Sequence, residues 1–381
     1  MLIPVSQPHM GEREKKYVNE ALDSNAISGV FGGFIDRFEA DFAKFCDSKY
    51  AVSCSNGTTA LHLAMAAAGV KEGDEVLVST LTNMASFFAV LYLNAKPVPV
   101  DIDLKTLTLD PADLARKITK KSKAIMVVHL FGHPTHMDPV NQLAAEHNLL
   151  VFEDCAEAHG ATYKGRKVGS LGNAGCFSFF ANKILTTGEG GMVTTDDPEI
   201  AKKARSLKAL AFGAANKFMH HDIGFNYRMT NLQAAVGCGQ MDHADELVEQ
   251  RRQIAQFYSK RFEQYQDYLC LPMEMDYAKS SYWMYHLVLR DSLVAKRSQI
   301  MHSLKEVGIE TREGFIPYNL QEIFINRGWT SPSDCPNANK VAYASFYLPT
   351  GPAITEPELD YVATKFCSIL DALITQLRRN I

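Results

Sequence analysis

The segment SFFANKILTTGEGG, from Ser178 to Gly191, places Lys183 among small, polar and glycine residues. A lysine in such a setting is most often a solvated surface residue. The segment VFEDCAEAHG, from Val151 to Gly160, changes this interpretation because its apolar run ends in acidic residues. That pattern is expected where a buried parallel strand reaches the ligand-binding edge of a sheet. The two segments therefore predict an amine and a strand-end carboxylate, Asp154, in one α/β site.

Short apolar runs alternate with helix-length segments from about residue 50 to residue 195. The expected strands are residues 50–55, 75–80, 97–103, 123–131, 149–154, 175–180 and 190–195, and the expected helices between them are residues 56–69, 84–93 and 138–147. Continuous apolar strands that alternate with helices predict a mostly parallel sheet, buried on both faces.

The pattern changes in the last third of the chain. Residues 241–268 predict one long amphipathic helix with a stripe formed by Leu247, Ile254, Phe257 and Tyr258. A strand at 282–290, a helix at 295–307, an extended segment at 309–317 and a final helix from 356 to about 377 follow. Because 381 residues exceed the usual size of a single core, we expect a large domain at 1–245 and a smaller α/β domain at 246–381.

Composition excludes several classes of protein. A net charge of −4 gives no electrostatic basis for binding nucleic acid or an anionic membrane. The one basic run, residues 116–123, is typical of a solvated helix end. No apolar stretch is long enough for a membrane span, and the amino terminus lacks a signal pattern. The eight cysteines are scattered without metal-ligand spacing, so we expect no metal site, free thiols and a cytoplasmic protein.

The turn Asn56-Gly57-Thr58-Thr59 lies between an expected strand and an expected helix. Gly57 permits a close approach of the backbone, and the first amides of the helix would point outward with the threonine hydroxyls. These groups predict an anion site, although a simple N-capped turn would account for the same residues. Ser178, five residues before Lys183, would face the same cavity and add a donor.

An amine, a strand-end carboxylate and an anion-binding turn are the parts that hold pyridoxal 5′-phosphate (PLP). In this interpretation Lys183 forms the Schiff base and Asp154 keeps the pyridine nitrogen protonated. Glu157 would reach the phenolic oxygen of the cofactor. Taken alone, Asp154 is equally consistent with a helix N-cap, and His159 with a structural histidine.

The loop Asn226-Tyr227-Arg228 is polar and aromatic, and it leads into the small-residue helix NLQAAVGCG. Such a loop more often forms a subunit contact than a catalytic site. Here it can serve both purposes if Asn226 or Arg228 reaches the phosphate site of a neighbouring subunit.

Taken together, these segments resemble the DegT/StrS family of PLP-dependent sugar aminotransferases, and within it most closely the perosamine synthases. The similarity rests on residues 3–24, SNGTTALHLA, GDEVLVSTLT, AIMVVHLFGHP, FEDCAEAHG, FSFFANKILTTGEGGMV and NYRMTNLQAA, in the order and spacing of the family. The resemblance implies a fold-type-I aminotransferase and a homodimer with active sites at the subunit interface. It assigns Lys183 and Asp154 as catalytic residues, Gly57, Thr58 and Ser178 as phosphate ligands, Glu157 to the ring oxygen, and Asn226 to the partner's site.

The chain departs from the family at two places. Asn83 stands where an aromatic residue usually stacks on the cofactor, so Phe87 or Phe88 is a possible substitute. In the small domain, Arg312, Glu313 and Asn319 occupy the segment where relatives select their substrate.

The resemblance implies transfer of the amino group of L-glutamate to a keto-sugar. The expected acceptor is a nucleotide-linked 4-keto-6-deoxy sugar used for surface polysaccharide such as lipopolysaccharide. An oxidised eight-carbon sugar acid, which would become 8-amino-Kdo, is the alternative acceptor. A regulatory protein without enzymatic activity is a third reading. Lys183 argues against a sugar dehydratase, because dehydratases of the family carry histidine there.

Overall fold

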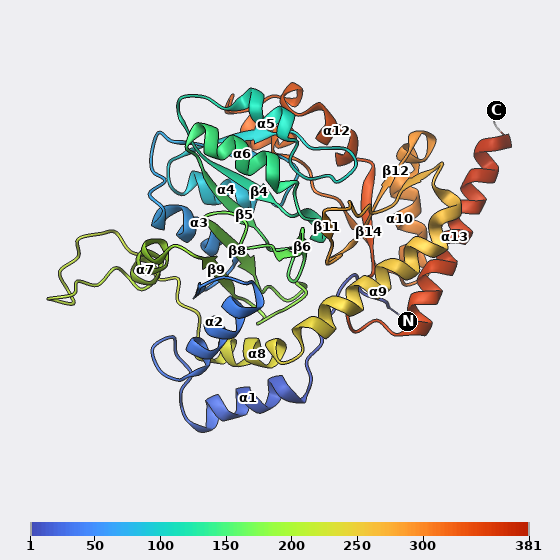
Figure 1. Cartoon of the computed structure of the whole chain (residues 1–381). Coiled ribbons are helices and arrows are strands. Elements are labelled where there is room, and N and C mark those ends of the chain that lie inside the picture. Colours follow the sequence, from blue (N-terminus) through green and yellow to red (C-terminus); the bar gives the residue numbers. More distant parts are fainter. Residues whose placement is uncertain (1, 380–381) are drawn as a thin grey trace.

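The computed structural model describes residues 2–379, except the side chain of Asp291. Its central sheet has the strand order β1-β9-β8-β5-β4-β2-β3 (Figure 1). The strands are β1 (Tyr50–Cys54), β2 (Glu75–Ser79), β3 (Lys96–Val100), β4 (Ser122–Val128), β5 (Leu150–Asp154), β8 (Ala174–Ser178) and β9 (Gly191–Thr195). From β8 to β3 all neighbours pair in parallel, and β9 is antiparallel to both β8 and β1. The mostly parallel sheet is thus confirmed, and β1, β2, β5 and β8 end at the same edge.

Successive strand residues divide between two apolar clusters, one on each face of the sheet. In β2, for example, Leu77 joins one cluster, whereas Val76 and Val78 join the other. This alternation follows from the two-residue period of a strand and explains why the apolar runs are continuous. The first face is covered by α2 (Phe34–Phe45), α6 (Met137–His147) and α8 (Asn231–Met241), and the second by α3 (Gly57–Ala67), α4 (Ala85–Leu91) and α7 (Pro198–Leu207). Helix α1 (Glu12–Asp23) packs on α8, and α5 (Pro111–Lys117) follows β3.

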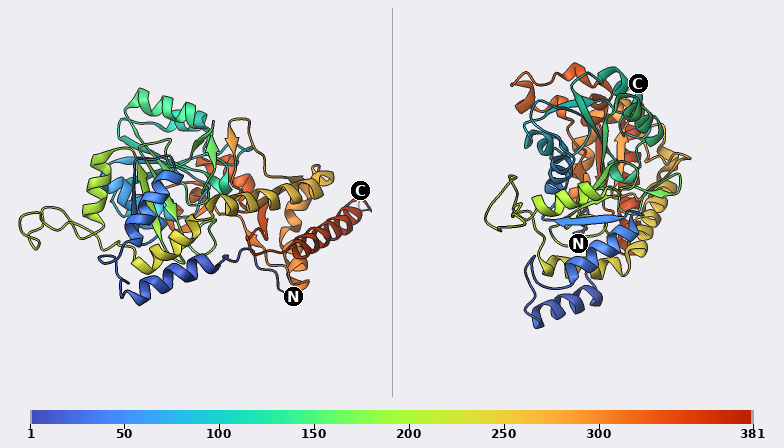
Figure 2. Two further views of the ribbon diagram at one scale, coloured as in Figure 1. Left: turned by 60° about the horizontal axis from the view of Figure 1, so that its bottom comes forward. Right: turned by 60° about the vertical axis from the view of Figure 1, so that its left-hand side comes forward.

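The smaller domain is an antiparallel sheet packed against three helices (Figures 1 and 2). Its strands, in spatial order, are β10 (Leu269–Cys270), β12 (Tyr285–Leu289), β14 (Ser345–Leu348) and β13 (Arg312–Glu313). Its helices are α9 (Ala244–Phe262), α10 (Arg297–Glu306) and α13 (Glu356–Arg379). A short sheet of β11 (Ala278–Lys279), β6 (Thr162–Tyr163) and β7 (Arg166–Lys167) links this part to the large sheet.

The long helix that we expected at 241–268 is shorter. Helix α8 ends at Met241, α9 begins at Ala244, and a 3₁₀ turn at 263–265 replaces its last predicted residues. The break coincides with His243, whose Nε2 lies 2.8 Å from the buried carboxylate of Glu14 on α1. Tertiary packing of α1 therefore interrupts a pattern that is continuous in sequence.

Two segments cross the expected boundary at residue 245. Ile3 packs in the core of the small domain and forms a bridge with Ile309. Conversely, residues 318–342, which carry α11 (Glu322–Ile325) and α12 (Pro336–Ala342), pack on the large sheet. The domain boundary at residue 245 therefore stays a prediction, and the segments around Ile3 and at residues 318–342 each pack on the domain on the other side of it.

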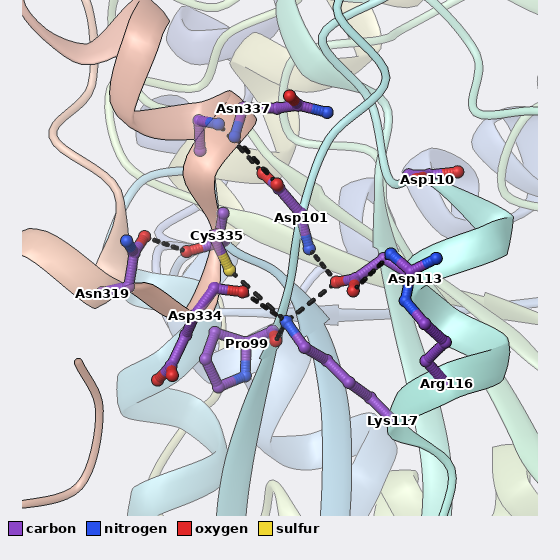
Figure 3. Close-up of polar contacts among 12 residues, drawn as sticks. Pro99, Asp101, Asp110, Asp113, Arg116, Lys117, Asn319, Asp334, Cys335 and Asn337 are labelled. Carbon is purple, nitrogen blue, oxygen red and sulfur yellow. Dashed lines mark hydrogen bonds and ion pairs between the residues drawn. The ribbon is translucent and has the colours of Figure 1, made fainter. Parts of the chain in front are cut away.

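Helix α12 is fastened to the edge of the large sheet by the carboxylate of Asp101, just after β3 (Figure 3). Its two oxygens accept the backbone N–H groups of Asn337 and Ala338, each at 2.9 Å. These are first-turn amides, which have no acceptor inside their own helix. The backbone N–H of Asp101 in turn donates to Asp113 at 2.7 Å, so one hydrogen-bonded chain joins α12, β3 and α5.

Lys117 belongs to the same cluster and is not the solvated residue that the basic run predicted (Figure 3). Its Nζ donates to the carbonyl oxygens of Pro99, at 2.7 Å, and Asp334, at 2.8 Å, and lies 2.8 Å from an oxygen of Asp113. The basic run is therefore not solvated throughout, because Lys117, near its start, joins segments that are far apart in sequence.

No helix in the described part of the chain combines the length and apolar character needed to cross a membrane. All eight cysteines are unpaired thiols, and six of them are buried.

We expect Asp101→Ala to reduce the free energy of unfolding by about 1–3 kcal/mol, because it leaves the buried amide of Ala338 and the partly buried amide of Asn337 without an acceptor. Urea unfolding followed by circular dichroism measures this loss. Asp110→Ala is the matched control, since Asp110 also caps a helix but accepts one exposed amide, that of Ala112. An equal loss in both variants would contradict the role of Asp101.

Candidate active site

A cavity of about 650 Å³ lies at the carboxyl edge of the central sheet, between the two domains. The large domain lines it with Asn56, Gly57, Thr58, Asn83, Asp154, Glu157, Ser178 and Lys183, among others, and the small domain with Trp283, Arg312, Phe315 and Tyr347. Residues that are far apart in sequence meet here because parallel strands end at the same edge. The structure therefore brings most of the predicted site residues into one space.

The turn after β1 presents an anion-binding surface to this cavity. The Oδ1 atom of Asn56 accepts the amide of Thr59 at 2.9 Å, and the amides of Gly57 and Thr58, in the first turn of α3, have no acceptor within the helix. The turn is therefore N-capped and still offers donors to the cavity, and its binding of an anion stays a prediction. A Cβ atom at Gly57 would lie 2.6 Å from the Cβ of Ser178, so only glycine lets the Ser178 hydroxyl come this close.

Asp154 ends β5 and is almost completely buried. Its carboxylate accepts the Ser86 hydroxyl at 2.8 Å and the Ala156 amide at 3.1 Å. Burial raises the pKa of Asp154, and these hydrogen bonds oppose that rise. The N-cap alternative is wrong, because turns rather than a helix follow β5. Ser86 was missed from sequence, since nothing in an apolar helix marks its one buried hydroxyl.

Lys183 and Glu157 face each other in the cavity, with Nζ 3.8 Å from Oε1. Burial lowers the pKa of Lys183, and the neighbouring carboxylates oppose that change. Burial raises the pKa of Glu157 to about 7, opposed by Lys183 and by the backbone N–H of Phe131, which donates to Oε2 at 2.9 Å. Phe131 makes this contact from a left-handed conformation, with φ at 52°.

Trp283 is a further site residue that the sequence did not reveal. Its ring centroid lies 3.8 Å from Lys183 Nζ, a cation–π distance, and its indole N–H donates to the carbonyl of Asn182 at 2.8 Å. The tryptophan thus contacts both the lysine and the backbone before it. The chain has only two tryptophans in 381 residues, and this rarity was the one sequence feature that could have indicated a role for Trp283 in a segment otherwise typical of a strand.

Neither proposed substitute for the stacking aromatic residue reaches the cavity. Phe87 is fully buried and stacks on Tyr318 at 4.0 Å between ring centroids. Phe88 packs near Phe324 on the same side of α4. The apolar face of α4 is thus committed to the core. Asn83 lines the cavity, and its Oδ1 accepts the amide of Ala85 at 3.0 Å.

Of the three expected substrate residues, only Arg312 lines the cavity. Glu313, the next residue of β13, faces the other way and pairs with Arg297 at 3.2 Å, as alternation along a strand requires. Asn319 is fully buried, where its Oδ1 accepts the Thr80 hydroxyl at 3.0 Å and its amide donates to Asn339 at 2.7 Å. The structure gives these two residues no contact with a substrate in this cavity.

Asn226 lies outside the cavity of its own chain, exposed, with its Oδ1 3.2 Å from Arg228. Its assignment to a neighbouring subunit stays a prediction. His159 is fully buried beside Phe42, Phe177 and Phe179, and burial lowers its pKa to about 3. This environment is that of a structural histidine.

His129, Glu153 and Cys155 approach each other closely enough to hold a metal ion. The polar atoms of His129 and Glu153 are already hydrogen-bonded within the protein. The Glu153 carboxylate accepts the amides of Gly169, Leu171 and Gly172 and lies 3.0 Å from His129 Nε2. The other ring nitrogen of His129 accepts the amide of Thr135. The cluster therefore anchors the loop before β8.

The cavity fits PLP. Donors at the start of α3 and on Ser178 suit a phosphate, Asp154 offers a buried carboxylate to a pyridinium, and Lys183 lies between the domains with a depressed pKa. Two buried carboxylates beside one amine leave the site short of positive charge, which a protonated pyridine nitrogen would supply.

We expect the cofactor-free protein to lose stability relative to Glu157→Gln as the pH rises. Because the folded state holds the Glu157 proton up to about pH 7, whereas the unfolded chain releases it near its ordinary pKa of 4.5, folding takes up a proton between these values. The stability of the parent should fall against the variant by up to about 3 kcal/mol across this window and stay level above it. Urea unfolding at pH 5 and pH 8 tests this, and a difference that does not change with pH would contradict it.

Comparisons with known proteins identify the family of this chain. Residues 8–367 match the DegT/DnrJ/EryC1/StrS aminotransferase family. A GDP-perosamine synthase of Caulobacter vibrioides is 41% identical over 368 residues, which cover 97% of this chain and 98% of that protein. Among solved structures, an aminotransferase from Psychrobacter cryohalolentis is 32% identical with a TM-score of 0.91, covering 98% and 99% of the two chains. DesV of S. venezuelae, solved in complex with a ketimine intermediate, is also 32% identical, with a TM-score of 0.86 and 93% of each chain covered.

These matches extend over nearly the whole chain, and the TM-scores of 0.91 and 0.86 show that the solved relatives share its fold. The regulatory reading is set aside, since the matched family and the solved relatives are aminotransferases. The chain belongs to the DegT/DnrJ/EryC1/StrS family of sugar aminotransferases and is a PLP-dependent aminotransferase.

Proposed function

We propose that the protein transfers the amino group of L-glutamate to the keto carbon of a nucleotide-linked 4-keto-6-deoxy sugar, in the cytoplasm, for a surface polysaccharide such as lipopolysaccharide. The observation that carries the proposal is the position of Lys183, 3.8 Å from Glu157 in a cavity that also contains Asp154 and the phosphate donors. The similarity to a GDP-perosamine synthase supports the sugar class.

In this proposal the large domain holds the cofactor. Gly57, Thr58 and Ser178 bind its phosphate, Asp154 accepts from the protonated pyridine nitrogen, and Glu157 lies beside the ring oxygen. When bound, PLP supplies an electron sink for the carbon that loses its proton.

Lys183 is the residue that moves protons. Because burial lowers its pKa, a larger fraction of its Nζ is neutral near neutral pH and can take the proton from the α-carbon of glutamate. The same amine returns a proton to the acceptor carbon in the second half of the cycle. Trp283 confines the amine to one side of the cavity, since it lies 3.8 Å from Nζ.

Arg312 is the candidate for recognition of the substrate. Its guanidinium lines the cavity beside Phe315 and Tyr347 and offers a planar fork to a carboxylate or to sugar oxygens. Glu313 and Asn319 were the sequence features that suggested an acceptor different from that of the relatives. Because neither of them lines the cavity, the nucleotide-linked sugar is favoured. The fork also suits the acid group of the eight-carbon alternative, so that acceptor is retained as an outcome of the test.

Exposed apolar side chains near the site support a homodimer. Tyr92 and Phe180 line the cavity, yet they are 60% and 45% exposed. Phe218 and Ile223, 79% and 87% exposed, belong to the segment between α7 and α8, and this segment extends from the body of the molecule in Figures 1 and 2. Apolar groups concentrated in this way favour burial against a second copy, which would bring Asn226 to the partner's phosphate site.

We expect the protein to aminate a nucleotide-linked 4-keto-6-deoxy sugar in the presence of glutamate. Mass spectrometry of reactions with nucleotide-linked 4-keto-sugars and with oxidised eight-carbon sugar acids measures this directly. Lys183→Ala is the control and should show no appreciable turnover, because it lacks the proton carrier. Amination of the sugar acid alone would replace the proposed acceptor, and turnover by Lys183→Ala without added amine would refute the assigned lysine.

The protein should sediment as a dimer at micromolar concentration, and Ile223→Asp should weaken the dimer and lower turnover together. The carboxylate would be buried without a partner in the interface. Ile323→Asp is the matched control, because Ile323 is also exposed but lies on α11. A fully active monomer would exclude a shared active site.

A further inference from the structure

A second cavity, of about 500 Å³, lies between the two domains and shares no lining residue with the active-site cavity. Its walls come from residues 104–107 and 130–133 of the large domain, residues 270–273 and strand β12 of the small domain, and the end of α12. Its size falls within the range of small-molecule sites. The α12 wall is held in place by Asp101, whose carboxylate accepts the amides of Asn337 and Ala338 (Figure 3).

The interior of this cavity is mainly apolar, and its charges have one sign. Leu107, Met284 and Val288 are among the apolar lining residues. The charged side chains that line it are those of Lys105, Arg290 and Lys340, all exposed, and none of the described lining residues is a carboxylate. Such a cavity would bind the apolar part of a ligand inside and an anionic group at the rim.

His286 adds an unused polar group to the wall. It is 5% exposed, and its ring stacks on Phe131 with centroids 4.0 Å apart. Its ring nitrogens form no hydrogen bond within the described part of the chain, and burial alone lowers its pKa to about 3. His286 lines the cavity, and a neutral imidazole offers one donor and one acceptor there. A polar atom of a ligand would satisfy it.

A layer of aromatic rings separates the two cavities. Phe131 and His286 line the second cavity, whereas Phe315 and Trp283, stacked 5.6 Å and 6.3 Å from Phe131, line the active site. The backbone N–H of Phe131 also donates to Glu157. A ligand against the Phe131 ring would therefore act on the residue that holds the active-site carboxylate.

We propose that this second cavity binds a small amphipathic anion, with an apolar body and one carboxylate or sulfonate group, and that its occupancy changes the rate of the active site. The binding stands on the cavity itself, and only the change of rate rests on the proposed function.

The test uses the PLP-loaded protein and the fluorescent probe 8-anilinonaphthalene-1-sulfonate, which has an apolar body and a sulfonate. At a saturating concentration of glutamate, we expect the protein to bind one probe molecule per chain, and the binding to reach saturation as the probe concentration rises. Lys105→Glu combined with Lys340→Glu should weaken it at least tenfold, because two rim cations become anions. Lys49→Glu combined with Lys202→Glu is the control of equal charge change, since both lysines are exposed and line neither cavity. Equal binding by both double variants, or no saturable binding by the parent, would overturn the site.

A second variant, Val288→Trp, fills the cavity from β12 and should abolish probe binding while the circular dichroism spectrum is retained. If this variant does not fold, the charge-reversal pair still decides the outcome. The rate of the glutamate half-reaction, followed by cofactor absorbance, should change with the probe in the parent and not in the charge-reversed variant. An unchanged rate in the parent would refute the effector role. Failure to find a sugar acceptor would leave both readouts intact, so the two proposals can fail separately.

Discussion

The burial of three ionisable groups at the carboxyl end of β5 is the constraint around which this structure is organised. Asp154, Glu157 and Lys183 are withdrawn from water in one cavity. A buried charge is unfavourable unless it is paired and hydrogen-bonded. Each carboxylate therefore receives donors from elsewhere, Asp154 from Ser86 and Glu157 from the backbone of Phe131. Two carboxylates and one amine still leave a deficit of positive charge, which a bound pyridinium would remove.

The rest of the fold supplies these partners. A parallel sheet brings strand ends to one edge, and α9 carries the chain to a second domain that closes the cavity. Arg251, buried on α9, donates to the carbonyl oxygens of Trp283 at 2.8 Å and Thr350 at 2.6 Å. This contact ties the start of β12 to the helix between the domains. Trp283 then reaches Lys183 and Asn182, so the position of the lysine depends on both domains.

The parts of the structure that sequence predicts are those with a local cause. Alternating apolar runs give the parallel sheet, and the rule that ligands bind at strand ends brings Lys183, Asp154 and Ser178 together. Contacts between segments far apart in sequence have no such signature. Lys117 looks like a surface lysine until residues 334–335 pack against it, and Asn319 looks accessible until the Thr80 loop covers it. Trp283 and Ser86 were missed for the same reason, since each acts across more than 60 residues of chain.

Phe131 shows how the same constraint extends beyond the active site. A left-handed conformation costs a non-glycine residue about 1–2 kcal/mol, so it persists only where other contacts compensate. Here the compensation comes from the hydrogen bond to Glu157 and from the stacked rings of His286 and Phe315. The hydrogen bond is stronger when Glu157 is ionised, because a carboxylate is a better acceptor than a carboxylic acid. The left-handed conformation of Phe131 and the ionisation of Glu157 therefore stabilise each other. A contact that fixes the Phe131 backbone favours the ionised carboxylate, and ionisation of Glu157 favours this backbone conformation.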